Sequence, residues 1–398
     1  MHPLGTHNWR ILGGILLLAL VLRASFGLVQ TGLHHSADER NWDGMAREFW
    51  LLGLCHPDSA TYRPPLYPLM LAGIYQVCGH DLVAVRLWQA FLGTALCGVF
   101  YGIGRRLGGE ATGLIAAGLG AVYPLFVFFT AVFMAETLLV LLTTVAILCA
   151  LRMAEVPSVK NAASLGGALG LAALCKPVVL AWAPFLLWGW WRGAGGSPRW
   201  RIFRLGIVLA TMLLVVAPWT GRNLLATGSF VLISSNFGMN LLVGNEPEAE
   251  GQYRWGVDYL GMVDELVSPS ADAVARDRAA ARQALKWIAA EPGRFAHLAV
   301  EKFVLFWSPL VAGESMGRNL LALFSCGPLL GLGLWGTWRL RTRPEGWTVA
   351  TLVVSLAVVH MIFFAHTRFR LPIDAALIAP AAWLLEQGVR RWWPGYKG

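Results

Sequence analysis

Apolar segments of about twenty residues recur along the whole chain and constrain its fold more than any other sequence feature. A helix needs roughly 20 mainly apolar residues to cross about 30 Å of hydrocarbon. In lipid the backbone must satisfy its own hydrogen bonds, so these segments are expected to be helical. We predict ten spans, at residues 10–29, 82–104, 111–128, 133–151, 162–178, 179–191, 205–220, 320–338, 347–365 and 371–389. The fifth and sixth are equally compatible with one bent hairpin around Lys176-Pro177.

The low charge content points to the same class of protein. Only 14% of the residues are charged, against about 25% in soluble domains, while 56% are hydrophobic. So few charges cannot cover a surface in water, which excludes a soluble enzyme. The net charge of +9 reflects where the basic residues fall, and we expect no nucleic-acid partner.

Basic residues gather in alternate short loops and predict the orientation of the chain. Cytoplasmic loops carry an excess of Lys and Arg, which places both termini in the cytoplasm. Arg23 interrupts the first apolar run and no A-x-A cleavage site follows it, so we expect a retained first span. The basic residues assigned inside are Arg105, Arg106, Arg152, Lys160, Arg192, Arg199, Arg201, Arg204, Arg339, Arg341, Arg343, Arg390, Arg391 and Lys397.

Two long loops, 30–81 and 221–319, are then predicted to lie outside. They hold 17 of the 23 acidic residues, whereas a channel or pump tends to place functional charge within its spans. We expect an all-α polytopic membrane protein forming a single transmembrane domain over 1–398, with no separate soluble domain. Its polar chemistry would sit on the outer face.

The first outer loop contains two candidate functional groups. Apolar residues recur at helical spacing from Trp42 to Trp50, which predicts an amphipathic helix on the membrane surface with Asp38 and Glu39 at its N-terminus. These acids either complement the helix dipole or supply a catalytic base. Arg63 precedes a double proline that leads into a helix starting near Pro65; it either anchors lipid headgroups or grips one phosphate.

The second outer loop is rich in glycine and asparagine, which predicts turns with positive φ. Ser270 is a predicted N-cap for a helix reaching about Ala290. A second amphipathic stretch, 295–307, carries Lys302 on its polar side and is expected to lie flat on the outer leaflet. The glycines and asparagines are Gly228, Asn236, Gly238, Asn240, Gly244 and Asn245.

Further candidates lie at the outer ends of predicted spans. Glu136 is an acid at membrane depth, for which a functional role and a hydrogen-bonded structural role are equally plausible. Lys176 is placed to anchor lipid or hold a phosphate, and Arg368 and Arg370 occupy a turn where the positive-inside rule disfavours cations. Four cysteines read as small core residues, and Cys55 and Cys78 of the first loop would be free to form a disulfide outside. The four are Cys97, Cys149, Cys175 and Cys326.

Taken in order, these segments resemble the GT-C membrane glycosyltransferases, within them the protein O-mannosyltransferase-like family and the aminoarabinose transferases acting on lipid A. The likeness runs from about residue 10 to 389. Trp42 and Arg63 stand where many relatives have tyrosine and lysine, and neither change removes the chemistry. The matching segments are Asp38-Glu39 with Trp42, Ala46 and Arg47; Tyr62-Arg63-Pro64-Pro65-Leu66-Tyr67; Met134-Ala135-Glu136-Thr137; Pro218-Trp219 with Arg222-Asn223; and Arg368-Phe369-Arg370-Leu371-Pro372.

The resemblance implies transfer of a sugar from a polyprenyl-phosphate donor to a hydroxyl of a lipid, glycan or protein acceptor, with inversion, on the outer face. It implies Asp38 as the base, and Glu39 as a group that orients its neighbours or helps a divalent cation. Arg63, with Lys176 and Arg222, would stabilise the departing phosphate. The other substrate-site candidates are Glu136, Asn236, Asn240, Arg368 and Arg370.

Two other functions remain open from the sequence. An O-antigen ligase or polymerase-like enzyme also has many spans and large outer loops. A lipid or glycan transporter would favour internal repeats, interrupted helices and midplane charges, and the sequence has no obvious repeat.

Overall fold

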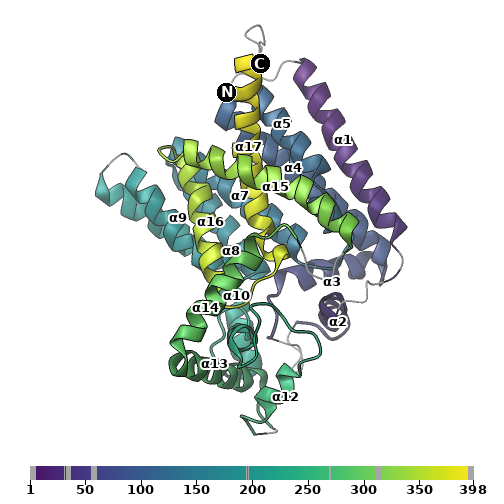
Figure 1. Ribbon diagram of the computed structural model, residues 1–398, viewed down its shortest axis with the longest axis vertical. Helices are drawn as coiled ribbons and strands as arrows, with labels where there is room; N and C mark the ends of the chain where they lie inside the picture. The colour runs from purple at the N-terminus through teal and green to yellow at the C-terminus, as the bar shows by residue number, and fades with distance from the viewer. Residues whose placement is uncertain are drawn as a thin grey trace.

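Every regular element in the described part of the chain is helical, and no strand occurs there. Figure 1 shows the computed structural model, which describes residues 6–30, 32, 37–54, 61–193, 195, 197–268, 270–310 and 315–392. The helices are α1 (Thr6–Val29), α2 (Ala37–Leu52), α3 (Leu66–Cys78), α4 (Leu82–Gly108), α5 (Glu110–Val122), α6 (Pro124–Phe128), α7 (Glu136–Glu155), α8 (Val159–Cys175), α9 (Val179–Gly193), α10 (Pro198–Thr227), α11 (Phe237–Asn245), α12 (Tyr259–Asp264), α13 (Ala273–Ala290), α14 (Pro292–Trp307), α15 (Met316–Arg339), α16 (Pro344–Ile362), the 3-10 turn η1 (Thr367–Arg370) and α17 (Leu371–Trp392).

Each predicted span overlaps at least one of these helices, and the chain is a multi-pass membrane protein. Six described helices are long and apolar enough to cross a membrane, so the predicted count of ten is not confirmed. Helix α8 is apolar but short, with 17 residues, and α9 has only 15. The six are α1, α4, α7, α10, α15 and α16.

The predicted third span is interrupted. Tyr123 is extended, with ψ of 116°, because the residue before a proline is pushed out of the helical region and Pro124 follows. Helix α5 therefore ends at Val122, and the short α6 ends at Phe128. Residues 129–135 then run without regular structure before α7 begins at Glu136. Most of this irregular segment is buried.

The start of α1 and the end of α17 lie at one end of the molecule, and helices α12 and α13 lie at the other (Figure 1). Helices α2 and α3 also lie toward that second end. Between them, α4, α5, α7 and α17 pack around a continuous buried core.

The second long loop differs from its prediction at its glycines. Gly238 and Gly244 lie within α11 and do not form turns with positive φ, unlike Gly228, whose φ is +65°. A Cβ on Gly238 would lie 1.8 Å from the carbonyl oxygen of Asp277 in α13, and one on Gly244 1.7 Å from that of Phe363. These glycines allow α11 to touch two neighbouring backbones, a role that local sequence does not reveal.

Two further expectations in this loop were wrong. The N-cap of α13 is Asp272, whose carboxylate accepts from the Ala275 amide at 2.7 Å, and Ser270 lies two residues before it. Lys302 is fully buried. Its Nζ donates to Asn245 Oδ1 at 2.9 Å and to the Ile362 carbonyl at 3.3 Å. Burial lowers the pKa of Lys302 to about 8.

The cysteines follow the expectation where they are described. The four assigned to spans are buried, and Cys78 is exposed. Cys55, the other cysteine of the first loop, lies outside the described residues.

Candidate active site

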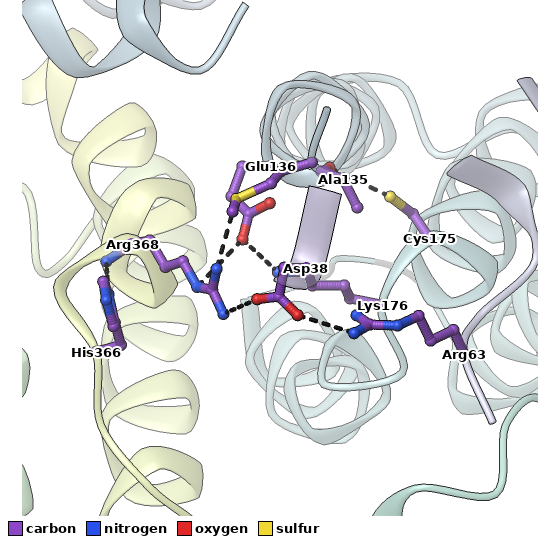
Figure 2. A network of polar contacts seen from close by, with 9 residues as sticks. Asp38, Arg63, Ala135, Glu136, Cys175, Lys176, His366 and Arg368 are labelled. Carbon is purple, nitrogen blue, oxygen red and sulfur yellow. Dashed lines mark hydrogen bonds and ion pairs between the residues drawn. The ribbon is translucent and has the colours of Figure 1, made fainter. Parts of the chain in front are cut away.

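Asp38 lies in the first turn of α2, between two arginines that are distant in the sequence (Figure 2). Its Oδ1 accepts from Arg63 Nη2 at 2.8 Å, and its Oδ2 accepts from Arg368 Nη2 at 2.6 Å. Both distances are in the range of strong charge-assisted hydrogen bonds. The Asp38 side chain is 28% exposed, so this carboxylate is held in place yet stays within reach of a ligand.

A second ion pair lies beside the first (Figure 2). Lys176 Nζ donates to Glu136 Oε1 at 2.7 Å, and Arg368 Nε lies 3.8 Å from the same oxygen. Arg368 also donates from Nη1 to Met134 Sδ at 3.4 Å. Arg368 therefore joins the two pairs. We call Asp38, Arg63, Glu136, Lys176 and Arg368 the polar cluster; its three cations and two carboxylates leave one positive charge in excess.

Local structure explains how Arg63 reaches Asp38. Arg63 stands just before Pro64-Pro65, and proline keeps the preceding residue extended. Its guanidinium lies over the Trp42 ring of α2, 4.7 Å from the centroid, and forms a cation–π contact that holds Arg63 in place. The backbone of this segment is tied to the second long loop, since the Ser235 amide donates to the Thr61 carbonyl at 2.8 Å.

The other cations also stand where helices end or begin. Lys176 follows the last residue of α8 and is extended, with ψ of 120°, because Pro177 comes next. Arg368 lies in η1, where its amide donates to His366 Nδ1 at 3.1 Å. Glu136 is in the first turn of α7. Each side chain projects from a helix terminus, and the termini meet at one place.

The charges around Asp38 set its ionisation. Burial would raise the pKa of Asp38, but the charges of Arg368 and Arg63 outweigh it and hold the pKa well below its usual range. Asp38 is therefore ionised at neutral pH. While both guanidinium groups remain bound, it is a weak proton acceptor.

Glu39 and Arg222, two more predicted site residues, also connect segments of the chain. Glu39 is fully buried, and its Oε1 accepts from the Phe133 amide at 2.9 Å. Arg222 donates from Nε to the Leu54 carbonyl at 2.7 Å and from Nη1 to Asn223 Oδ1 at 3.2 Å. These contacts link α2 to the irregular segment and the first loop to α10.

The remaining candidates lie in other networks. Arg370 is buried and donates from Nε to Asp374 Oδ1 at 3.0 Å and from Nη1 to the Phe306 carbonyl at 2.9 Å. Asn236 precedes α11 and accepts from Ser234 Oγ at 3.0 Å. The backbone amide of Asn240 donates to the backbone carbonyl of Asn236 at the start of α11.

No local sequence pattern indicates the contact that Met134 makes with Arg368. The sequence places Trp42 on an apolar face and in the family motif, and neither pattern indicates its contact with the guanidinium of Arg63. No group of three or more His, Cys, Asp or Glu suited to a metal ion occurs among the residues the structure describes.

Solved structures identify the class of fold. The chain is similar to the oligosaccharyltransferase of Archaeoglobus fulgidus in the apo form, with a TM-score of 0.61 and 13% identity over 97% of this chain and 51% of that one. It is also similar to the archaeal oligosaccharyltransferase AglB of Archaeoglobus fulgidus in complex with an inhibitory peptide and a dolichol-phosphate, with a TM-score of 0.57 and 12% identity over 99% and 52% of the two chains. The chain spans about half the length of these archaeal proteins. Its fold is that of the GT-C membrane glycosyltransferases.

A protein-family model also matches part of the chain. Residues 62–221 match the model for dolichyl-phosphate-mannose-protein mannosyltransferases, and this stretch contains Arg63, Glu136 and Lys176. The resemblance seen in the sequence is thereby confirmed. The chain is also similar to ArnT of Cupriavidus metallidurans bound to undecaprenyl phosphate, with a TM-score of 0.47 and 18% identity over 98% of this chain and 80% of that one. No curated protein matches the chain in sequence.

Proposed function

We propose that this chain is an integral-membrane glycosyltransferase that moves a sugar from a polyprenyl-phosphate donor to an acceptor hydroxyl, with inversion. The observation that carries the proposal is the position of Asp38 between Arg63 and Arg368, beside the Lys176–Glu136 pair. A base next to several cations is what transfer from a phosphate-linked sugar requires. The dolichol-phosphate in the archaeal structure of the same fold is a lipid of the proposed kind.

In this reaction the acceptor oxygen attacks the anomeric carbon while its proton passes to Asp38. The bond between that carbon and the phosphate oxygen breaks, and the phosphate leaves with the bonding electrons. Negative charge therefore grows on the phosphate in the transition state, where Arg63, Arg368 and Lys176 would stabilise it. We assign Glu136 to holding Lys176 and Arg368 in place.

Phosphate binding would also prepare the base. A phosphate accepts from guanidinium groups in the same forked geometry as a carboxylate. As Arg63 and Arg368 turn toward the donor, Asp38 loses the two charges that depress its pKa and becomes a better proton acceptor. The donor thus activates the residue that must deprotonate the acceptor.

We place this site on the outer face of the membrane, with both termini in the cytoplasm. The supporting observations are the basic residues of the short loops and the position of helices α2 and α3 in Figure 1, away from the start of α1 and the end of α17. On this view 1–398 is one GT-C-like transmembrane domain, and the loops 30–81 and 221–319 form its outer part. Membrane lipids surround the rest.

A donor panel tests the proposal directly. Purified protein in lipid nanodiscs would be offered radiolabelled polyprenyl-phosphate sugars, and sugar transfer or release would be scored. We expect turnover of at least one donor and its loss in Asp38→Asn. A protein that binds no polyprenyl phosphate and turns over no donor would overturn the proposal.

A further inference from the structure

The irregular segment 129–135 leads directly into Glu136, and its polar groups need partners. In an apolar interior each unsatisfied backbone group costs several kcal/mol. Side chains from three other elements supply partners to this backbone. Arg86 Nε donates to Ala131 O at 3.2 Å, Glu39 Oε1 accepts from Phe133 N at 2.9 Å, and Thr137 Oγ1 donates to Phe129 O at 2.8 Å.

Gln89 of α4 makes two hydrogen bonds to this segment. Its Nε2 donates to the carbonyl oxygens of Thr130 and Val132, each at 3.0 Å. Its Oε1 accepts from Tyr67 Oη at 2.9 Å. Gln89 and Tyr67 are both fully buried. One amide therefore links the irregular segment to α3.

The hydrogen bonds of Gln89 lead to two different sides of the polar cluster. The Tyr67 ring packs edge-on against the Trp42 ring with centroids 5.4 Å apart, and Trp42 carries the guanidinium of Arg63. On the other side, the Val132 carbonyl also accepts from the Met134 amide at 2.9 Å. Met134 in turn accepts a hydrogen bond from Arg368.

We infer that Gln89 is a positioning residue that fixes the spacing between Arg63 on one side of the site and Arg368 and Glu136 on the other. The inference rests on the proposed function. A phosphate shared by Arg63 and Arg368 requires both guanidinium groups at a set separation, and a displacement of about 1 Å is enough to cost about 100-fold in rate. Gln89 touches none of the five residues of the polar cluster through its hydrogen bonds, so it would act through their supports.

The test measures kcat and the KM for donor separately, in nanodiscs. Gln89→Met keeps the shape but loses all three hydrogen bonds, and we expect kcat to fall about 30- to 100-fold with KM changed by less than about threefold, because all three cations remain. Tyr67→Phe removes one hydroxyl and should lower kcat about 5-fold. The double variant should resemble Gln89→Met alone, because both changes break one linkage.

Thr351→Val is the matched control. It removes a buried partner of Trp182 Nε1, 3.2 Å away between α9 and α16, and should lower the unfolding temperature while leaving kcat within about twofold. If Tyr67→Phe and Gln89→Met also keep kcat within about twofold, the inference is wrong and Gln89 only stabilises the bundle. Should Gln89→Met not fold, Tyr67→Phe decides alone. If the wild-type protein turns over no donor, the proposed function is wrong and this inference falls with it. If the wild-type protein and both variants are fully active, only the inference is wrong.

Discussion

Replacing Asp38 by asparagine should separate donor binding from turnover. In the structure the carboxylate holds two guanidinium groups, at 2.8 and 2.6 Å, which the donor phosphate would have to take over. The amide is neutral and competes less well for both. Asp38→Asn should therefore bind lipid phosphate more tightly than wild type, although it has lost its base.

The geometry sets the size of this effect. Hydrogen bonds to a charged group contribute about 1.5–3 kcal/mol and neutral ones about 1 kcal/mol. Because Asp38, Arg63 and Arg368 are 28%, 18% and 21% exposed, solvent screening reduces the difference to about 1 kcal/mol per arginine. Two arginines give about 2 kcal/mol, or roughly 30-fold in Kd. Turnover should fall by about 10²–10⁴ through loss of the base.

Calorimetric titration of nanodisc-embedded protein with polyprenyl phosphate lacking a sugar would measure the Kd, and radiolabelled donor would measure kcat. Asp264→Asn is the control, since it makes the same charge change at an exposed pair with Arg276, 3.0 Å away in the second long loop. Weaker phosphate binding by Asp38→Asn, or turnover within a few-fold of wild type, would refute the reasoning.

Three further results are expected. Arg63→Lys should retain part of the activity and Arg63→Ala should lose about 2–4 kcal/mol of transition-state stabilisation; an alanine variant with wild-type kcat at saturating donor would reduce Arg63 to a lipid anchor. Arg368→Gln removes a charge that favours ionised Asp38, so the pKa of Asp38 rises and the acid limb of a kcat/KM pH profile moves to higher pH; an unmoved limb would contradict this. Reporter fusions at Lys160 should report cytoplasm and at Glu250 the outer side, and a cytoplasmic signal at Glu250 would exclude the proposed site.

Local patterns predicted the elements that carry the site. The amphipathic spacing of α2 and the double proline before α3 are signals within a few residues, and both helices formed where they were expected. The sequence also named each residue of the polar cluster as a candidate. It did not show that Arg368 contacts Asp38, because nothing local relates two turns so far apart in the chain.

Other features depend on packing between distant elements. The amphipathic pattern of its helix predicts a solvent-exposed Lys302. In the structure Lys302 is buried because Asn245 and the end of α16 pack beside it. The need for a glycine at position 244 depends likewise on the close approach of the Phe363 backbone to α11. The hydrogen bond from Arg222 to the Leu54 carbonyl could not be predicted either, because its acceptor is a backbone atom that no side-chain pattern reveals.

The contact between Asp38 and Arg368 also has a consequence for biosynthesis, because 330 positions separate the two residues. At about 5–20 residues per second, roughly 20–60 s pass between their syntheses on the ribosome. During that interval α2 can already lie at the membrane with Asp38 paired only to Arg63, while the insertion machinery still handles the later helices. The guanidinium that joins the two ion pairs arrives only with η1. A nascent chain should therefore complete its polar cluster late, after nearly all of its helices have been inserted into the bilayer.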